Sequence, residues 1–229
     1  MKVEVWSDFT SVESYLGKLH LEKAIDQFPH SEYVVIEHKT FLLQQNFKKT
    51  SEKNNVNGEN HQIQNNNKSE PIDSIQLTRL HQKPVHEINT TLAHRLAHFA
   101  RSKNKGRECI DQIFLAHFAE YKLIDDLTTL ARIAEKIGLC PVETESVLQS
   151  NKYIRQIDID LDEAEQMGIE TLPFIVINET YAVPGSYTTN EYVEVLSSIW
   201  EEIKFKPRYK FTKNNSRTSF CEGDHCNGR

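Results

Sequence analysis

Residues 3–18 place a strand directly before a helix, with almost no residues between them for a turn. Val3 and Val5 alternate with polar neighbours, as residues on a half-buried strand do. Apolar residues then recur at the spacing of a helix, at Val12, Tyr15, Leu16 and Leu19. The sequence therefore predicts a helix whose N-terminus lies at the end of a strand, and this unit is the strongest constraint on the fold.

Hydroxyl side chains occupy that junction. Thr10 is followed three residues later by Glu13, the spacing of a capping box, and Ser11 or Ser14 could equally bond free backbone amides of the first helical turn. Hydroxyls at a helix start are most often caps. A capping role and direct contact with a ligand both remain open for Ser11 and Ser14.

The rest of the chain shows predicted strands and helices in a definite order. Residues 33–36 are β-rich and suit a buried strand, whereas residues 44–71 are rich in Asn, Lys, Gln, Glu and Ser and read as a polar flexible loop. Helical periodicity dominates from residue 88 to 167. Residues 174–178 and 181–183 then read as a β-hairpin, followed by a last helix that Asn190 is expected to cap.

This order predicts an α/β protein, a thioredoxin fold with an all-helical domain inserted between its second and third strands. We assign residues 1–43 and 168–203 to the thioredoxin-like domain and residues 72–167 to the inserted helical domain. Residues 204–229 form a C-terminal tail that contains a pair of cysteines.

Two motifs resemble the DsbA family, in particular its intracellular FrnE-like branch, over roughly residues 1–200. Ser11-Val12-Glu13-Ser14, followed by Tyr15-Leu16-Gly17-Lys18, resembles the corner where Cys-x-x-Cys opens the first helix and Tyr-x-Gly-Lys follows. Residues 168–176 are similar to the Gly-x-x-x-x-Pro segment before the third strand. The resemblance implies that the Leu172–Pro173 bond is cis and faces the corner. Further agreement comes from residues 181–185 and from residues 91–96, which include His94.

The resemblance implies a protein of the thiol-disulfide oxidoreductase family with a degenerate site. In the family, a thiolate acidified by the helix N-terminus attacks disulfides, and a serine hydroxyl cannot replace it. A peptide-binding cleft would lie at Leu172 and Pro173 and be lined by His94. Any dithiol exchange would run through Cys221 and Cys226, because FrnE-like proteins often carry a second cysteine pair of this spacing.

Two alternatives remain open. Kappa-class glutathione transferases and 2-hydroxychromene-2-carboxylate isomerases also place serine at the first of these positions, where the hydroxyl can stabilise a glutathione thiolate. Glutathione is then a co-substrate held by Ser11, although Glu13 would repel a thiolate and those enzymes usually have Ser-Pro-x-Ser. The other alternative is a non-catalytic module that binds a peptide or protein.

The sequence gives no sign of a resident cofactor or metal. His94 and His98 lie four residues apart, but no third ligand accompanies them. In the tail, His225 and the two cysteines provide three soft ligands, so a metal clip there is a further alternative. Cys109 and Cys140 are expected to be core residues rather than reactive thiols.

The composition limits which partners and which cellular compartment we expect for this protein. The net charge of −6 argues against nucleic acid and anionic membranes as partners. No apolar run approaches the roughly 20 residues that span a bilayer, and the first strand follows Met1 without room for a secretory signal. We therefore expect a cytoplasmic protein whose partners are proteins, peptides or glutathione.

Overall fold

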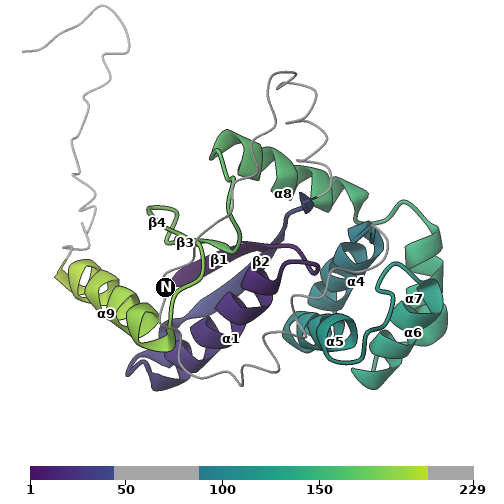
Figure 1. Ribbon diagram of the computed structural model, residues 1–229, viewed down its shortest axis with the longest axis horizontal. Helices are drawn as coiled ribbons and strands as arrows, with labels where there is room; N and C mark the ends of the chain where they lie inside the picture. Colours follow the sequence, from purple (N-terminus) through teal and green to yellow (C-terminus); the bar gives the residue numbers. More distant parts are fainter. Residues whose placement is uncertain (44–87, 206–229) are drawn as a thin grey trace, which may run out of the picture.

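The computed structural model describes residues 1–43 and 88–205 (Figure 1). Three predicted segments lie outside the described residues: the polar loop at 44–71, the start of the inserted domain at 72–87, and the tail from residue 206 onward, which contains Cys221 and Cys226. Of the predicted tail at 204–229, only residues 204 and 205 are described. The elements are β1 (Lys2–Ser7), α1 (Val12–Gln27), the 3₁₀ turn η1 (Ser31–Tyr33), β2 (Val35–Thr40), α4 (Thr91–Ser102), α5 (Gly106–Phe118), α6 (Leu127–Lys136), α7 (Pro141–Gln149), α8 (Ile154–Gln166), β3 (Phe174–Ile177), β4 (Tyr181–Pro184) and α9 (Thr189–Phe205).

A mixed sheet in the order β2-β1-β3-β4 forms the centre of the molecule. β1 runs parallel to β2 and antiparallel to β3, and β3 pairs with β4 as a hairpin. Helices α1 and α9 cover one face, where Val5, Leu21 and Leu196 are buried together. Helix α8 covers the other face, where Ala164 packs with Trp6 and Val176 (Figure 1). The predicted fold, a thioredoxin fold with a helical insertion, is confirmed.

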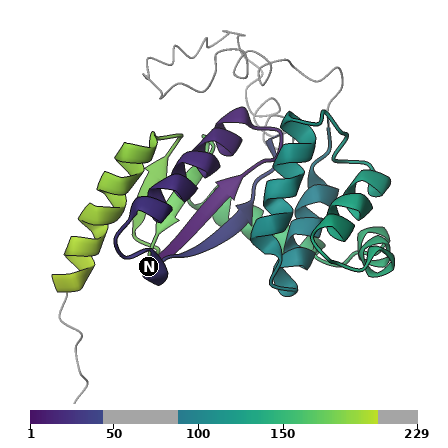
Figure 2. The same cartoon turned by 90° about the horizontal axis from the view of Figure 1, so that it is seen from below.

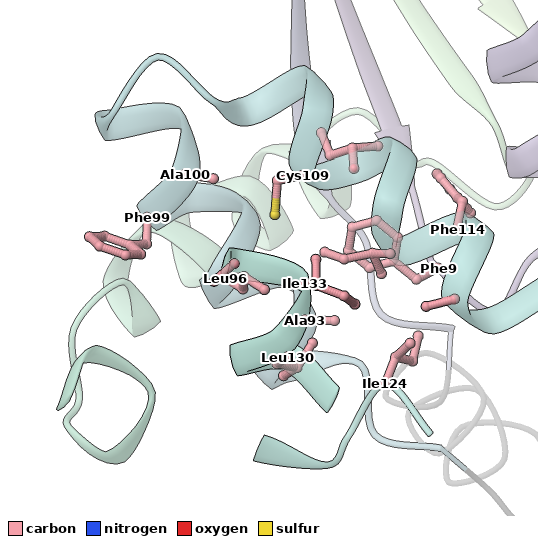
Figure 3. Packing of buried hydrophobic residues seen from close by; sticks show 14 of the residues in the cluster. Phe9, Ala93, Leu96, Phe99, Ala100, Cys109, Phe114, Ile124, Leu130 and Ile133 are labelled. Carbon is pink, nitrogen blue, oxygen red and sulfur yellow. The ribbon is translucent and has the colours of Figure 1, made fainter. Parts of the chain in front are cut away.

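Helices α4 to α7 pack together beside the sheet (Figure 2). Their common core includes Leu96, Phe99, Cys109, Phe114 and Leu130. Phe9, which lies between β1 and α1, is buried in the same cluster and meets Phe114 edge-on with 5.0 Å between ring centroids (Figure 3). The segment that leads into α1 is therefore fixed by the inserted helices as well as by the sheet.

Two local predictions were wrong. Residues 31–33 form a 3₁₀ turn, and the second strand begins only at Val35, which is 64% exposed because β2 is an edge strand. Helix α9 begins at Thr189, one residue before the predicted cap Asn190. Thr188 and Glu191 form the capping box there, since each side chain bonds the backbone amide of the other.

Candidate functional site at the N-terminus of α1

Ser11 is the N-cap of α1. Its Oγ accepts a hydrogen bond from the Ser14 amide at 3.0 Å, and its hydroxyl lies 3.3 Å from Glu13 Oε2, to which it donates. The capping box predicted for Thr10 is therefore wrong, because the Thr10 amide and hydroxyl both donate to Asp8 Oδ1 at 2.8 Å. Ser11 is only 6% exposed, and its hydroxyl stabilises the helix start as well as lining the corner.

Ser14 is the third residue of α1, within its first turn, and is almost fully buried. Its Oγ has no hydrogen-bond partner within residues 1–43 and 88–205. A buried hydroxyl without a partner is costly unless another group bonds it. Ser14 therefore offers an unused donor and acceptor at the place where the family resemblance puts the second cysteine.

Pro173 packs directly on α1, one turn beyond Ser14. A Cβ built on Gly17 would lie 2.5 Å from Pro173 Cγ, so only glycine leaves room for the proline ring. The Leu172–Pro173 peptide bond is cis, and the Pro173 carbonyl accepts from the Gly185 amide at 2.8 Å. The structure thus brings together Ser11, Ser14 and Pro173, three of the residues that the sequence analysis selected.

Leu172 lies at the open end of this corner. β1 pairs with β3 only as far as Trp6 and Phe174, so Leu172 lies just outside the ladder. Among the described residues, no hydrogen bond engages the Leu172 amide or carbonyl. The corner therefore combines two hydroxyls with an unpaired stretch of backbone just before β3.

Asp8 holds the corner in place, and the sequence analysis missed it. The Asp8 carboxylate, 2% exposed, accepts hydrogen bonds from Thr10, from the Leu43 amide at 3.0 Å and from the Thr90 hydroxyl at 3.2 Å. It thereby ties the β1–α1 segment to the end of β2 and to the start of α4. An aspartate after a strand is too common for its partners, 35 and 82 residues away, to be inferred from sequence.

His94 is buried against Phe9, and the centroids of the two rings are 4.5 Å apart. Burial lowers the pKa of His94 to about 4, against the opposing effect of Asp8. Its neighbour His98 contacts Asp160 at 3.3 Å and Thr40 at 2.9 Å. The charge of His98 helps to lower the pKa of His94, so the two histidines share one environment, and no cluster of three metal-ligating side chains occurs among the residues that the structure describes.

The cysteines of the described chain differ in exposure. Cys109 is fully buried in the core of the helical insertion, and burial raises the pKa of its thiol above the ordinary range. Cys140 is exposed at the N-cap of α7, so the expectation that it is a core residue was wrong. The candidate pair Cys221 and Cys226 lies outside the described residues.

Comparison with known proteins now adds to this geometry. Residues 2–197 match the family model of the DSBA-like thioredoxin domain. The chain belongs to this family. An uncharacterised protein of Bacillus subtilis, YwbO, is 31% identical over 109 residues, which cover 47% of this chain and 54% of YwbO. The chain thus matches about half the length of this curated relative.

Several solved structures share the fold. A probable DsbA oxidoreductase of Streptomyces coelicolor superposes with a TM-score of 0.68 at 24% identity, covering 88% of this chain and 91% of that one. A 2-hydroxychromene-2-carboxylate isomerase gives 0.62 at 19% identity, covering 89% and 96%. The cytosolic disulfide reductase DsbM of Pseudomonas aeruginosa, solved with glutathione, gives 0.59 at 9% identity, covering 88% and 100%. Among the described residues of our chain, no helix has the length and apolarity needed to cross a membrane.

Proposed function

We propose that this member of the DSBA-like family binds a cysteine-containing peptide in the cytoplasm, with glutathione as the smallest such ligand, at the corner of Ser11, Ser14 and Leu172. The observation that carries the proposal is the unpaired Leu172 backbone beside Pro173, which packs on α1 one turn from Ser14. An extended peptide can pair with such a backbone segment, while its thiol approaches the hydroxyls of the first helical turn.

The two hydroxyls suit a thiol ligand better than they suit disulfide exchange. A serine O–H can donate to a thiolate, and the N-terminus of α1 adds a favourable dipole for negative charge. To do so, the Ser11 hydroxyl must turn away from Glu13, to which it donates over a long 3.3 Å contact. The glutathione-bound DsbM and the isomerase share this fold, which supports glutathione as the first ligand to test.

Binding of glutathione is measured by isothermal titration calorimetry at millimolar concentration. The matched control ligand is γ-glutamyl-alanyl-glycine, which keeps the backbone and both carboxylates and lacks only the thiol. We expect the control to bind about tenfold more weakly, the value of one charge-assisted hydrogen bond. Ser14→Ala should remove most of that difference. Equal affinity for the two tripeptides, or no binding of either, would refute the proposal.

Catalytic dithiol exchange is a second candidate, supported by membership of the DSBA-like family. Cys109 is buried, with its pKa raised, and Cys140 is an isolated exposed residue, so neither provides a reactive pair. We therefore assign any such exchange to Cys221 and Cys226. Reduction of insulin by the full chain is compared with that by Cys221→Ser and, as control, by Cys140→Ser. The assignment requires that only Cys221→Ser loses the activity; turnover retained in that variant excludes the tail pair.

A further inference from the structure

A second cavity, separate from the Ser11 corner, lies between the edge of the sheet and the inserted helices. It has a volume of about 690 Å³, is open to solvent on one side and is lined by β2, the C-terminal end of α1, η1, α4 and α5. Neither Ser11, Ser14, Leu172 nor Pro173 contributes to its lining. Cavities of this size accommodate small organic molecules.

Two histidines of this lining each have a buried ring nitrogen without a described hydrogen-bond partner. His94 is only 4% exposed, and its Nε2 is buried without a hydrogen-bond partner among the described residues. Nδ1 of His38 on β2 is likewise buried and without a described partner. A ligand in the cavity would supply the missing partners, which a buried polar atom requires.

Positive charge surrounds the His38 end of the cavity. Arg101 and Arg107 line it, with side chains 43% and 62% exposed, so that their guanidinium groups lie toward solvent at its edge. The pKa of His38 is lowered to about 3, first by burial and then by the charges of Lys18, Arg107 and Arg101. Each of these cations also pairs with a carboxylate: Lys18 with Glu22 and Asp111, Arg107 with Glu22, and Arg101 with Glu37. Of the three cations, only Arg101 and Arg107 line the cavity, and each could also donate to an anionic group beside His38.

Apolar side chains form part of the remaining wall, alongside the polar residues Ser7, Lys39, Thr40 and His98. Ile36 projects from β2, while Ala97 of α4 and Ile110 of α5 face the cavity from the inserted helices. Asp26 and Glu32 line the end formed by α1 and η1, which disfavours a second negative charge there. The cavity thus combines one cationic end, an apolar middle and one acidic end.

We infer that this interdomain cavity binds a small organic monocarboxylate, with its carboxylate at His38, Arg101 and Arg107 and its apolar body between Ile36 and Ile110. Neutral His38 can donate from Nδ1 to the carboxylate in one tautomer, and the two guanidinium groups can donate in addition. His94 at the other side offers Nε2 to a polar group of the ligand. The inference does not depend on the thiol peptide proposed for the Ser11 corner.

The test uses 4-phenylbutanoate as the probe and 4-phenylbutanamide, its uncharged analogue, as the control ligand. Backbone amide shifts of the full chain are followed by NMR during titration. We expect saturable shifts confined to β2, α4 and α5, and an affinity for the amide that is about tenfold lower because the charge-assisted bonds are lost. No saturable shift, shifts concentrated at residues 172–174, or equal affinity for acid and amide would each overturn the inference.

Three variants sharpen the assignment. Ala97→Phe should narrow the cavity and weaken the binding of 4-phenylbutanoate several-fold, and an unchanged affinity in this variant would overturn the inference. His38→Leu removes a ring nitrogen that has no described partner, so the fold should persist while the preference for acid over amide falls. Arg107→Gln should weaken 4-phenylbutanoate binding several-fold, whereas Arg132→Gln on the exposed face of α6, the matched control, should not.

Discussion

Pro173 packs against Gly17 so closely that a side-chain carbon on Gly17 would lie 2.5 Å from the proline ring. This contact joins the segment before β3 to the first helix and sets the width of the corner at Ser11 and Ser14. Its two residues are 156 positions apart in the chain, and both lie in motifs that the sequence analysis had selected for other reasons.

Gly17→Ala should destabilise the protein despite the higher helix propensity of alanine. Propensity favours alanine by about 1 kcal/mol, while overpacking against a rigid ring costs about 1–3 kcal/mol, so we expect a net loss of up to about 2 kcal/mol in the free energy of unfolding. Urea denaturation measures it. Lys23→Ala on the exposed side of α1 is the control and should change stability little. A stabilised Gly17→Ala variant would show that the proline contact yields easily.

Restoring both thiols should restore thiol chemistry at the corner. In Ser11→Cys/Ser14→Cys, the first thiol lies at the N-cap of α1, so its pKa should fall below the free value of about 8.5. Thiolate absorbance as a function of pH measures this shift in a chain where Cys140, Cys221 and Cys226 are replaced by serine. The same variant should reduce insulin. An ordinary thiol pKa would mean that the helix start does not activate this position.

Arg95→Met should destabilise the protein strongly. The buried Arg95 guanidinium donates to the carbonyls of Val147 at 2.6 Å and Leu148 at 2.9 Å, and also to those of Ser150 and Lys152, so it caps the C-terminal end of α7. Removing the donor leaves several of these carbonyls without a partner, at a cost of about 3–5 kcal/mol.

Thermal and urea denaturation measure this loss, with Arg132→Met, an exposed arginine on α6, as the control. Arg95→Lys should rescue little, because one ammonium group cannot reach carbonyls that a planar guanidinium bonds from several sides. A loss below about 1 kcal/mol for Arg95→Met would contradict the capping role.

His94 should make the protein sensitive to acid. Its pKa is lowered from 6.5 to about 4 by burial, so the unfolded chain binds the proton more tightly than the folded chain does. Stability is therefore unaffected by His94 above pH 6.5 and falls as the pH drops from 6.5 towards 4.

His94→Phe keeps a ring against Phe9 and cannot titrate. Between pH 8 and about 4.5, the variant should lose about 2 kcal/mol less than the natural chain. Urea denaturation at each pH measures the difference, and the values at pH 8 serve as the reference for both proteins. Parallel pH profiles for the two proteins would contradict the burial of a neutral imidazole.

The two described cysteines should differ in reactivity. Cys140 is exposed and should react with iodoacetamide in the folded protein, whereas Cys109 is fully buried with a raised pKa and should react only after unfolding. Peptide mapping by mass spectrometry identifies the labelled residue. Labelling of Cys109 under native conditions would indicate opening of the core formed by α4, α5 and α6.

The sequence by itself determined the order of elements and the position of the corner. The strand at Val3 and Val5, the helix start at Ser11 and the Gly-x-x-x-x-Pro segment before Phe174 are local signals, because periodicity, capping and turn chemistry depend on neighbouring residues. These signals were sufficient to predict the fold and the helical insertion. They also identified Ser11, Ser14 and Pro173 as candidates that the structure brings to one place.

Only the tertiary structure decided which polar groups are satisfied and which remain available. That β2 is an edge strand, that Asp8 bonds Leu43 and Thr90, and that His38 and His94 meet at one cavity all depend on contacts between segments distant in the chain. Hydrophobic patterning does not encode such contacts, because it specifies which face of an element is buried but not which polar side chains meet across the interface. The cavity beside β2 exists only once the sheet edge and the inserted helices are packed together.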